Sequence, residues 1–215
     1  MIKSIIYTLT YIIFFIVVAI ILFINLAPQF GSNPSSEQKV FYDSFTNYSK
    51  GGFENFEPTP MMTGEISTWD FFKEDSSRKP TSAILPKSIN FDSFAKTNSD
   101  YRLAWLGHSA FLINVMGKII LLDPMLGSHA APIPLPNLKR FNEVLPIKLD
   151  SVDRIDFVVI SHDHYDHLDY STIKLLKDKV SKFLAPHGIG NHLKKWGVKS
   201  NQIVELNWNE SFSTE

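Results

Sequence analysis

The chain begins with an apolar run that strongly limits what its first residues can form. Residues 5–26 read IIYTLTYIIFFIVVAIILFINL and contain no acidic or basic side chain. A helix of roughly 20 apolar residues spans the hydrocarbon core of a bilayer, where every backbone polar group must find a partner inside the protein. We therefore predict that residues 1–27 form a transmembrane anchor. Two alternatives are a cleavable signal, whose apolar centre is usually about 7–15 residues long, and a buried core helix.

The charges around this run predict its direction in the membrane. Lys3 and the amino terminus precede the run, and the first stretch after it carries Glu37, Lys39 and Asp43. Positive charge is preferentially retained on the cytoplasmic side. We expect a single-pass membrane protein whose carboxyl-terminal part is extracytoplasmic. The sequence Leu26-Ala27-Pro28 lacks the small-residue pattern of a signal cleavage site, which favours an anchor that is not removed.

Composition excludes several kinds of function for the rest of the chain. Its 215 residues include no cysteine, so disulfides, cysteine zinc sites, iron–sulfur clusters and thiol nucleophiles are excluded. With 21 basic and 22 acidic residues, the chain lacks the broad positive surface of a general nucleic-acid-binding protein. A hydrophobic content of 44% is sufficient for a packed core. We expect one domain with an appendage and no nucleic-acid partner.

Residues 28–98 are predicted to form an irregular strap across the domain or the membrane surface. Prolines and glycines interrupt this segment every few residues, which prevents long regular elements. Aromatic residues are too frequent in it for a solvated linker, so we expect the segment to pack on another part of the molecule. They are Phe41, Tyr42, Phe45, Tyr48, Phe53, Phe56, Trp69, Phe71 and Phe72. The spacing of the first of them predicts a short helix at residues 36–48.

Regular secondary structure is expected in residues 99–215. Alternating apolar residues separated by tight turns predict three antiparallel strands. They lie at residues 102–106, 110–116 and 119–122. After a Pro-rich loop, residues 155–160 are apolar and β-branched, which is typical of a strand buried on both faces. The period then changes to a helical one over residues 170–184, with Val180 and Phe183 on the apolar side. This order of elements predicts an α/β fold.

Three of the seven histidines lie within six residues, directly after the predicted buried strand, in the sequence SHDHYDHLD of residues 161–169. Imidazole nitrogen and carboxylate oxygen are standard ligands of zinc and similar divalent ions. Alternate side chains of an extended segment point to the same side, so His162 and His164 can bind one ion. Asp166 and His167 follow where the chain turns and can reach a second ion about 3.5–4 Å from the first. We predict that these four residues are metal ligands.

Other polar residues near the cluster have plainer explanations. Asp163 should point away from the neighbouring histidines. Asp169 is expected either to cap the following helix or to support a ligand. Single histidines are more often loop, core or surface residues than ligands, and we expect these roles for His129, His187 and His192.

The pattern H-x-H-x-D-H after a buried strand resembles the signature of the metallo-β-lactamase fold, an αββα sandwich whose members are mostly zinc-dependent hydrolases. Further segments are similar to the branch that contains N-acylphosphatidylethanolamine-hydrolysing phospholipase D and its bacterial relatives. These segments are Trp105–Ser109, Leu122–Pro124, Lys139–Phe141, Ile155–His162, His164–Asp169 and Glu205–Trp208, with Pro28–Gly31 and Pro58–Met62 ahead of them.

The resemblance implies a cofactor and roles for the ligands. Two Zn²⁺ ions would be held, the first by His162 and His164 and the second by Asp166 and His167. In this family a water molecule activated by the ions attacks the substrate, and no protein nucleophile is needed. The residue that matches Asp166 also forms a hydrogen bond to that water, which makes Asp166 the predicted catalytic residue.

The resemblance also places residues beside the ligands. His108 and Asp123 would lie next to the site and support it. The alternatives are that His108 is only a turn residue and that Asp123 only caps the end of a strand. Lys139-Arg140 could meet a phosphate group, although Asn137-Leu138 replaces the Gly-Pro that is more usual before it.

The family pattern continues beyond the position that matches Trp208, where its remaining metal ligands lie. We therefore expect residues 99–215 to hold the amino-terminal part of the sandwich, as in a truncated member. The resemblance implies hydrolysis of phosphodiesters, with an N-acylphosphatidylethanolamine-like phospholipid or another small molecule as the substrate. The alternatives are a lactonase or ester hydrolase of the same fold, and a truncated, inactive, membrane-anchored remnant.

Overall fold

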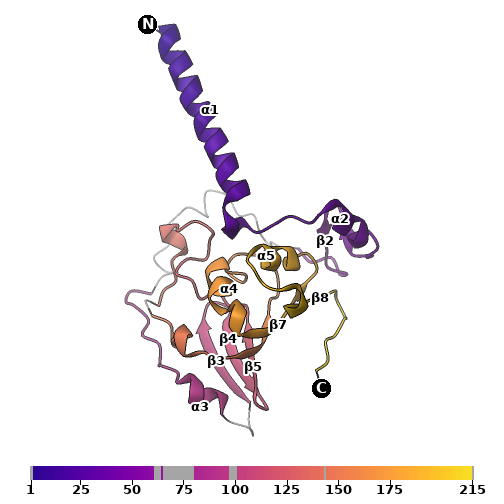
Figure 1. Cartoon of the computed structure of the whole chain (residues 1–215). Helices are drawn as coiled ribbons and strands as arrows, with labels where there is room; N and C mark the ends of the chain where they lie inside the picture. Colours follow the sequence, from indigo (N-terminus) through magenta and orange to yellow (C-terminus); the bar gives the residue numbers. More distant parts are fainter. Residues whose placement is uncertain (1, 61–63, 65–79, 97–100, 143, 215) are drawn as a thin grey trace.

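The computed structural model describes residues 2–60, 64, 80–96, 101–142 and 144–214. Helix α1 (Ile2–Leu26) projects from one end of a body built around a β-sheet (Figure 1). None of the described residues of α1 is buried, and the helix is long and apolar enough to cross a bilayer. The predicted amino-terminal helix is therefore confirmed. Its length and composition are consistent with a membrane anchor or a signal sequence.

The body contains a sheet of six described strands in the order β3-β4-β5-β6-β7-β8. The first three strands are antiparallel, and each later strand runs parallel to its predecessor in the sheet. The strands are β3 (Arg102–Gly107), β4 (Ala110–Val115), β5 (Lys118–Leu122), β6 (Ile155–Val159), β7 (Val180–Pro186) and β8 (Ile203–Leu206). The predicted strands within residues 102–122 and at 155–160 are thus confirmed as β3 to β6.

Helices α4 and α5 cover one face of this sheet and supply much of the core. Leu112 on β4 and Phe183 on β7 are buried with Ile173 on α4 and Leu193 on α5. The described helices of the body are α2 (Ser36–Tyr42), α3 (Phe91–Ala95), α4 (Tyr170–Leu176) and α5 (Ile189–Lys195). Short 3-10 turns are η1 (Pro28–Phe30), η4 (Pro136–Leu138), η5 (Leu149–Ser151), η6 (Lys177–Lys179) and η7 (Ser200–Gln202).

The helix predicted at residues 170–184 is wrong in its second half. Helix α4 ends at Leu176, and a 3-10 turn leads directly into strand β7. Val180, Phe183 and Ala185 are buried in β7, which lies between β6 and β8. The spacing of Val180 and Phe183 fits one side of a helix, but both residue types also favour strands, and pairing with two neighbours decides the outcome.

The helix predicted at residues 36–48 is too long. Helix α2 begins with a capping box formed by Ser35 and Gln38 and ends at Tyr42. A two-residue hairpin follows, in which β1 (Tyr48–Ser49) pairs with β2 (Gly52–Phe53). Lys50 and Gly51 between them have φ values of 51° and 83°. Such tight turns with two positive φ values suit the twist of a hairpin, so this turn replaces further helix.

Several aromatic residues of the amino-terminal segment pack on the body, as expected, whereas Phe56 is 52% exposed. Phe41, Phe45 and Phe53 have ring centroids 5.8, 4.8 and 6.0 Å from that of His187, which follows β7. Tyr42 is buried in the same cluster. This contact joins α2 and the β1–β2 hairpin to the sheet. Trp69, Phe71 and Phe72, for which packing was also expected, lie outside the described residues.

A compact junction joins α1 to the body. The Trp196 indole N–H donates to the carbonyl of Pro28 at 2.7 Å, and the backbone N–H of Ser32 donates to Nδ1 of His192 at 2.9 Å. Lys195 donates to the carbonyl of Gly31. Gly31 has a φ of 67°, and a Cβ there would lie 1.7 Å from Nδ1 of His192, so a side chain cannot be accommodated without displacing the junction.

Candidate metal centre

The candidate site lies where β5 and β6 end and where β3 turns into β4. Asp123 follows β5, and residues 161–168 follow β6. The backbone N–H of Asp123 donates to the carbonyl of Val159 at 2.9 Å, which keeps the two strand ends together. The β3–β4 turn brings His108 to the same edge of the sheet. The carboxyl ends of parallel strands are a common location for sites in α/β folds.

Asp123 is a buried carboxylate that holds the loop after β6. Its Oδ1 accepts the backbone N–H of Ser161 at 2.7 Å, and its Oδ2 accepts the Ser161 hydroxyl at 2.8 Å. The N–H at Nδ1 of His167 donates to the same Oδ2 at 3.0 Å. A carboxylate bonded in this way fixes the tautomer of the imidazole and leaves Nε2 with a free lone pair for a metal ion.

His162 and His164 face each other across the start of the loop. Nε2 of His162 lies 3.1 Å from Nδ1 of His164. Two nitrogens bound to one tetrahedral zinc at about 2.0–2.1 Å are separated by about 3.3 Å, so this spacing suits two ligands of one ion. Burial lowers the pKa of His162, and the neighbouring His167 and His164 lower it further. The imidazole is therefore held in the neutral form that binds metals.

Asp166 joins the histidine loop to the β3–β4 turn. Its Oδ2 accepts the N–H at Nε2 of His108 at 2.8 Å and lies 3.7 Å from Nε2 of His167. Ligand atoms of these three residues all lie within 4.8 Å of one another, so the group could hold a metal ion. Burial alone would raise the pKa of Asp166, but the hydrogen bond from His108 and the nearby His167 lower the pKa overall. The carboxylate is thus ionised at neutral pH, as a metal ligand must be.

A tight turn and a helix cap fix the loop that carries these side chains. The backbone N–H groups of His167 and Leu168 donate to the carbonyl of His164 at 3.0 and 2.8 Å. Asp169 is buried and caps α4, because its carboxylate accepts the backbone N–H of Ser171 at 3.0 Å. It also accepts the N–H of Gly127 at 2.8 Å, which ties the loop after β5 to α4. The cap predicted for Asp169 is confirmed.

The turn that carries His108 has an uncommon backbone conformation. Gly107 and His108 have φ values of 110° and 47°. The indole N–H of Trp105 donates to the carbonyl of His108 at 2.7 Å and so closes the turn. This places a histidine of β3–β4 beside a carboxylate that lies far away in the sequence.

The structure brings the four predicted ligands to one place, with His108 and Asp123 beside them. Their function as ligands stays a prediction, which is developed below. Asp163 is exposed. The other histidines are occupied elsewhere: His129 with Ser128, His187 with the aromatic cluster and His192 with the α1 junction. Sequence reasoning missed Ser161, which contacts both Asp123 and Nδ1 of His162. The position of Ser161 directly before the histidine cluster is the feature of the sequence from which this role could have been inferred.

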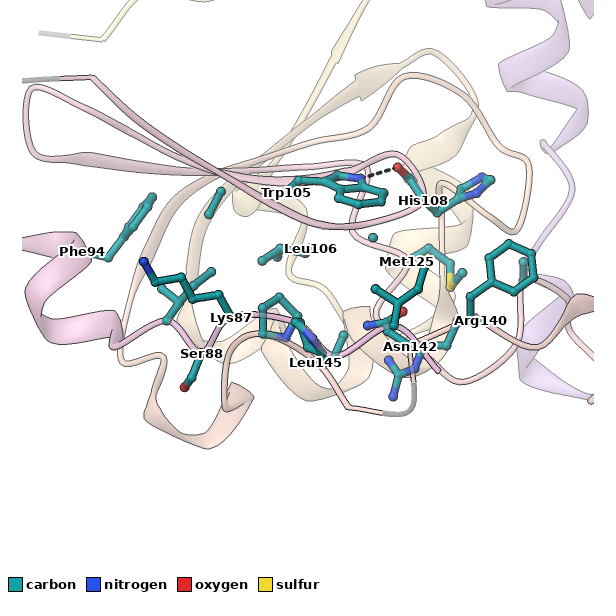
Figure 2. A pocket seen from close by; sticks show the side chains of 18 of the residues that line it. Lys87, Ser88, Phe94, Trp105, Leu106, His108, Met125, Arg140, Asn142 and Leu145 are labelled. Carbon is teal, nitrogen blue, oxygen red and sulfur yellow. Dashed lines mark hydrogen bonds between the residues drawn. The ribbon is translucent and has the colours of Figure 1, made fainter. Parts of the chain in front are cut away.

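A large cavity of about 1130 Å³ adjoins this site. In Figure 2, His108, Met125 and Arg140 lie at one end of it, and Phe94 and Lys87 lie at the other. Asp166 also belongs to the lining. The walls are largely apolar; their apolar residues include Ile89, Phe94, Ala104, Leu106, Met125, Leu138, Leu145 and Pro146.

The cavity also contains a positive charge. Arg140 lines its wall and donates to the carbonyl of Leu126 at 2.7 Å, which fixes the guanidinium in place. Burial lowers the pKa of Arg140, and the nearby Asp169 opposes this effect. Guanidinium groups remain charged in proteins, so Arg140 offers a fixed cation next to an apolar surface. Lys139, its neighbour in the predicted phosphate contact, also belongs to the lining.

Parts of this chain are similar to known proteins. Residues 118–215 match the family described as "Beta-lactamase superfamily domain". Uncharacterized protein Rv0906 of Mycobacterium tuberculosis is 35% identical over 84% of this chain and 49% of its own length. N-acyl-phosphatidylethanolamine-hydrolyzing phospholipase D 1 of Caenorhabditis elegans is 34% identical over 84% of this chain and 51% of its own. A UPF0173 metal-dependent hydrolase of Hyperthermus butylicus is 27% identical over 48% of this chain and 40% of its own.

Solved structures are similar over a smaller part. CmlA, a diiron beta-hydroxylase from Streptomyces venezuelae, shares 26% identity over 55% of this chain and 23% of its own, with a TM-score of 0.41. The chain spans about half the length of the curated relatives that it matches over most of its residues. Residues 118–215 are thus similar to the β-lactamase superfamily domain, and the sheet with its helices is a metallo-β-lactamase-like partial fold.

Proposed function

We propose that this chain acts as a metal-dependent hydrolase of phosphodiesters that carry apolar chains, such as an N-acylphosphatidylethanolamine-like phospholipid. One observation carries the proposal. Asp166 lines one end of an apolar cavity that also contains Arg140, and His162, His164 and His167 lie beside Asp166 in the same loop. Such a site combines metal donors, a fixed cation and room for hydrocarbon.

The donors fit divalent ions. In the proposal, His162 and His164 hold a first Zn²⁺, and Asp166 and His167 hold a second. All are nitrogen or carboxylate oxygen donors, the chemistry that zinc accepts, and Asp123 supports His167 from behind. When bound, the ions would lower the pKa of a water towards neutrality and stabilise negative charge on the substrate.

The side chains of this chain would orient water and substrate. Asp166 is the proposed catalytic residue, because its carboxylate can accept a hydrogen bond from the attacking water. His108 holds this carboxylate in place through its Nε2. Arg140 can pair with a phosphate oxygen, since a guanidinium matches the geometry of an anionic group. The apolar walls would bind acyl chains and exclude water from the reacting end.

Two features support a phosphodiester over a lactone or another ester. The metal donors suit phosphorus and carbonyl substrates alike, but the positive charge of Arg140 and Lys139 in the lining favours an anionic substrate. The name of the phospholipase relative points in the same direction. Helix α1 supports a membrane location, and Lys3 supports placing the body outside the cytoplasm.

The test uses the purified full chain in detergent micelles, loaded with Zn²⁺. We expect release of phosphatidic acid from N-acylphosphatidylethanolamine, and little turnover of lactone or carboxylic ester panels. His164→Ala should abolish this turnover and lower the zinc content. His129→Ala is the matched control, because His129 lies in a loop and contacts Ser128 rather than the site.

The outcomes separate the proposal from its alternatives. Preferential turnover of lactones would favour the lactonase alternative. Stoichiometric zinc without turnover of any panel would favour an inactive remnant. Equal turnover by His164→Ala and His129→Ala would contradict the assignment of the site.

A further inference from the structure

The loop between β5 and β6 carries an uncharged apolar tip. Residues 131–136 read APIPLP, and we refer to them as the apolar tip. Ile133 and Leu135 are 42% and 48% exposed. Three prolines restrict the backbone of the tip, so it presents these side chains with little further loss of entropy. Adjacent exposed apolar residues of this kind mark an interaction surface more often than isolated ones do.

The base of the loop fixes the apolar tip to the body. The backbone N–H of Ala130 donates to the carbonyl of Leu138 at 2.9 Å, and that of Arg140 donates to Ser128 at 3.1 Å. The Arg140 side chain makes a further bond to Leu126. The position of the tip relative to the sheet is therefore set by several hydrogen bonds.

The apolar tip lies at the end of the body from which α1 leaves. In Figure 1, the 3-10 turn η4, drawn in salmon, is level with the base of α1. The junction of α1 with α5 is held by the bonds of Pro28, Gly31 and Ser32 described above. A bilayer crossed by α1 would therefore have its surface at the level of the tip.

The chemistry of the surroundings suits a lipid surface. Lys139 is exposed next to the tip and can meet anionic headgroups. Ala130 and Leu138, at the base of the loop, line the same cavity as His108 and Asp166. The loop thus reaches from the end of the body where α1 leaves to the wall of the proposed substrate cavity.

We infer that the apolar tip inserts into the lipid surface beside α1, as a second membrane contact. The inserted tip holds the cavity at the level of the headgroups, so that a lipid reaches the site without crossing water. This inference rests on the proposed membrane anchoring by α1. It concerns a lipid surface and not a protein partner.

The absence of cysteine makes a direct test simple, because one introduced cysteine is a unique labelling position. The full chain with Ile133→Cys is labelled with an environment-sensitive fluorophore and reconstituted into vesicles of phosphatidylcholine and phosphatidylglycerol. The matched control is Met116→Cys. Met116 is 75% exposed in the β4–β5 turn, at the end of the sheet opposite the site.

We expect the label at position 133 to show blue-shifted emission and to lose most of its intensity when the lipids carry nitroxide quenchers. The label at position 116 should respond to aqueous iodide and not to the nitroxide lipids. Equal access of iodide to both positions would overturn the inference. A label at position 133 that is shielded from both quenchers would also overturn it, and so would a chain that does not float with the vesicles. The readout does not depend on catalysis, so a chain that hydrolyses nothing can still support or refute it.

Discussion

Asp123 organises several groups of the site at once. Its buried carboxylate accepts two bonds from Ser161 and one from Nδ1 of His167. These contacts fix both the start of the histidine loop and the tautomer of one proposed ligand. A carboxylate behind a metal-bound histidine commonly contributes to affinity without touching the ion.

This arrangement predicts the effect of Asp123→Asn. The variant keeps the size of the side chain but loses the charge that holds His167, so zinc affinity should fall by about 10–100-fold. Titration against a competing chelator measures the change. Asp163→Asn is the control, because Asp163 is exposed in the same loop. Equal zinc affinity of the two variants would show that Asp123 does not act through His167.

For single residues, the sequence predicts the proposed metal ligands better than it predicts the residues that hold those ligands in place. The proposed ligands follow an apolar strand at a characteristic spacing, and this local pattern can be recognised from the sequence alone. They are His162, His164, Asp166 and His167. The contact between His108 and Asp166 joins residues 58 positions apart and depends on a turn with positive φ. Single-sequence reasoning could place His108 near the site only through the resemblance.

Among the elements, α4 shows where periodicity alone is insufficient. Val180 and Phe183 continue the apolar side of α4 in sequence, yet the chain leaves the helix after Leu176 and enters the sheet. Their partners in β6 and β8 are distant in sequence, so a short stretch of sequence does not show the stabilisation that comes from pairing on both sides. The antiparallel strands β3 to β5 were predictable because tight turns connect them.

The start of α4 gives a prediction at the scale of elements. Asp169→Ala removes the cap of α4 and the acceptor for the N–H of Gly127. Loss of a cap costs about 0.5–2 kcal/mol, and the part-buried N–H of Gly127 also loses its acceptor, so the free energy of unfolding should fall by about 2–3 kcal/mol. Urea unfolding followed by circular dichroism measures it.

Asn90→Ala is the matched control for that experiment. Asn90 caps α3, because its side-chain oxygen accepts the backbone N–H of Ser93 at 2.9 Å. We expect a loss of about 1 kcal/mol. A smaller effect of Asp169→Ala than of Asn90→Ala would contradict the account of how the histidine loop is anchored.

For the whole molecule, the junction between α1 and the body determines how the site sits relative to a membrane. Residues 28–32 are held by His192, Lys195 and Trp196 of the α5 region. The sequence predicts that residues 28–98 pack on another part of the molecule, because their aromatic content is too high for a solvated linker. It could not predict the surface on which the segment docks, since that surface is formed by residues about 160 positions away.

The junction should depend on pH through His192. Burial lowers the pKa of this histidine below its ordinary value of 6.5, and Nδ1 accepts a hydrogen bond only in the neutral form. His192 therefore binds a proton more readily when the segment is released than when the segment is docked on it. The contribution of His192 to docking of residues 28–32 on the α5 region is fully present above about pH 6.5, and it is lost as the pH falls further.

Limited proteolysis measures this effect at the junction. Cleavage within residues 27–35 should be faster at about pH 5.5 than at about pH 7.5 in the natural chain. In His192→Asn the rate should be insensitive to this change, after correction for the pH dependence of the protease on an unfolded peptide. A natural chain with the same corrected rate at both pH values would refute the role of His192.

The metal content of the purified chain shows whether the histidine loop binds divalent ions. The full chain, purified gently and reconstituted with Zn²⁺, is analysed by mass spectrometry of bound metal beside a variant with His162→Ala, His164→Ala and His167→Ala. We predict stoichiometric zinc in the natural chain and its loss in the variant, with unchanged circular dichroism. Equal zinc content in both proteins, or a natural chain that retains no divalent ion, would contradict it.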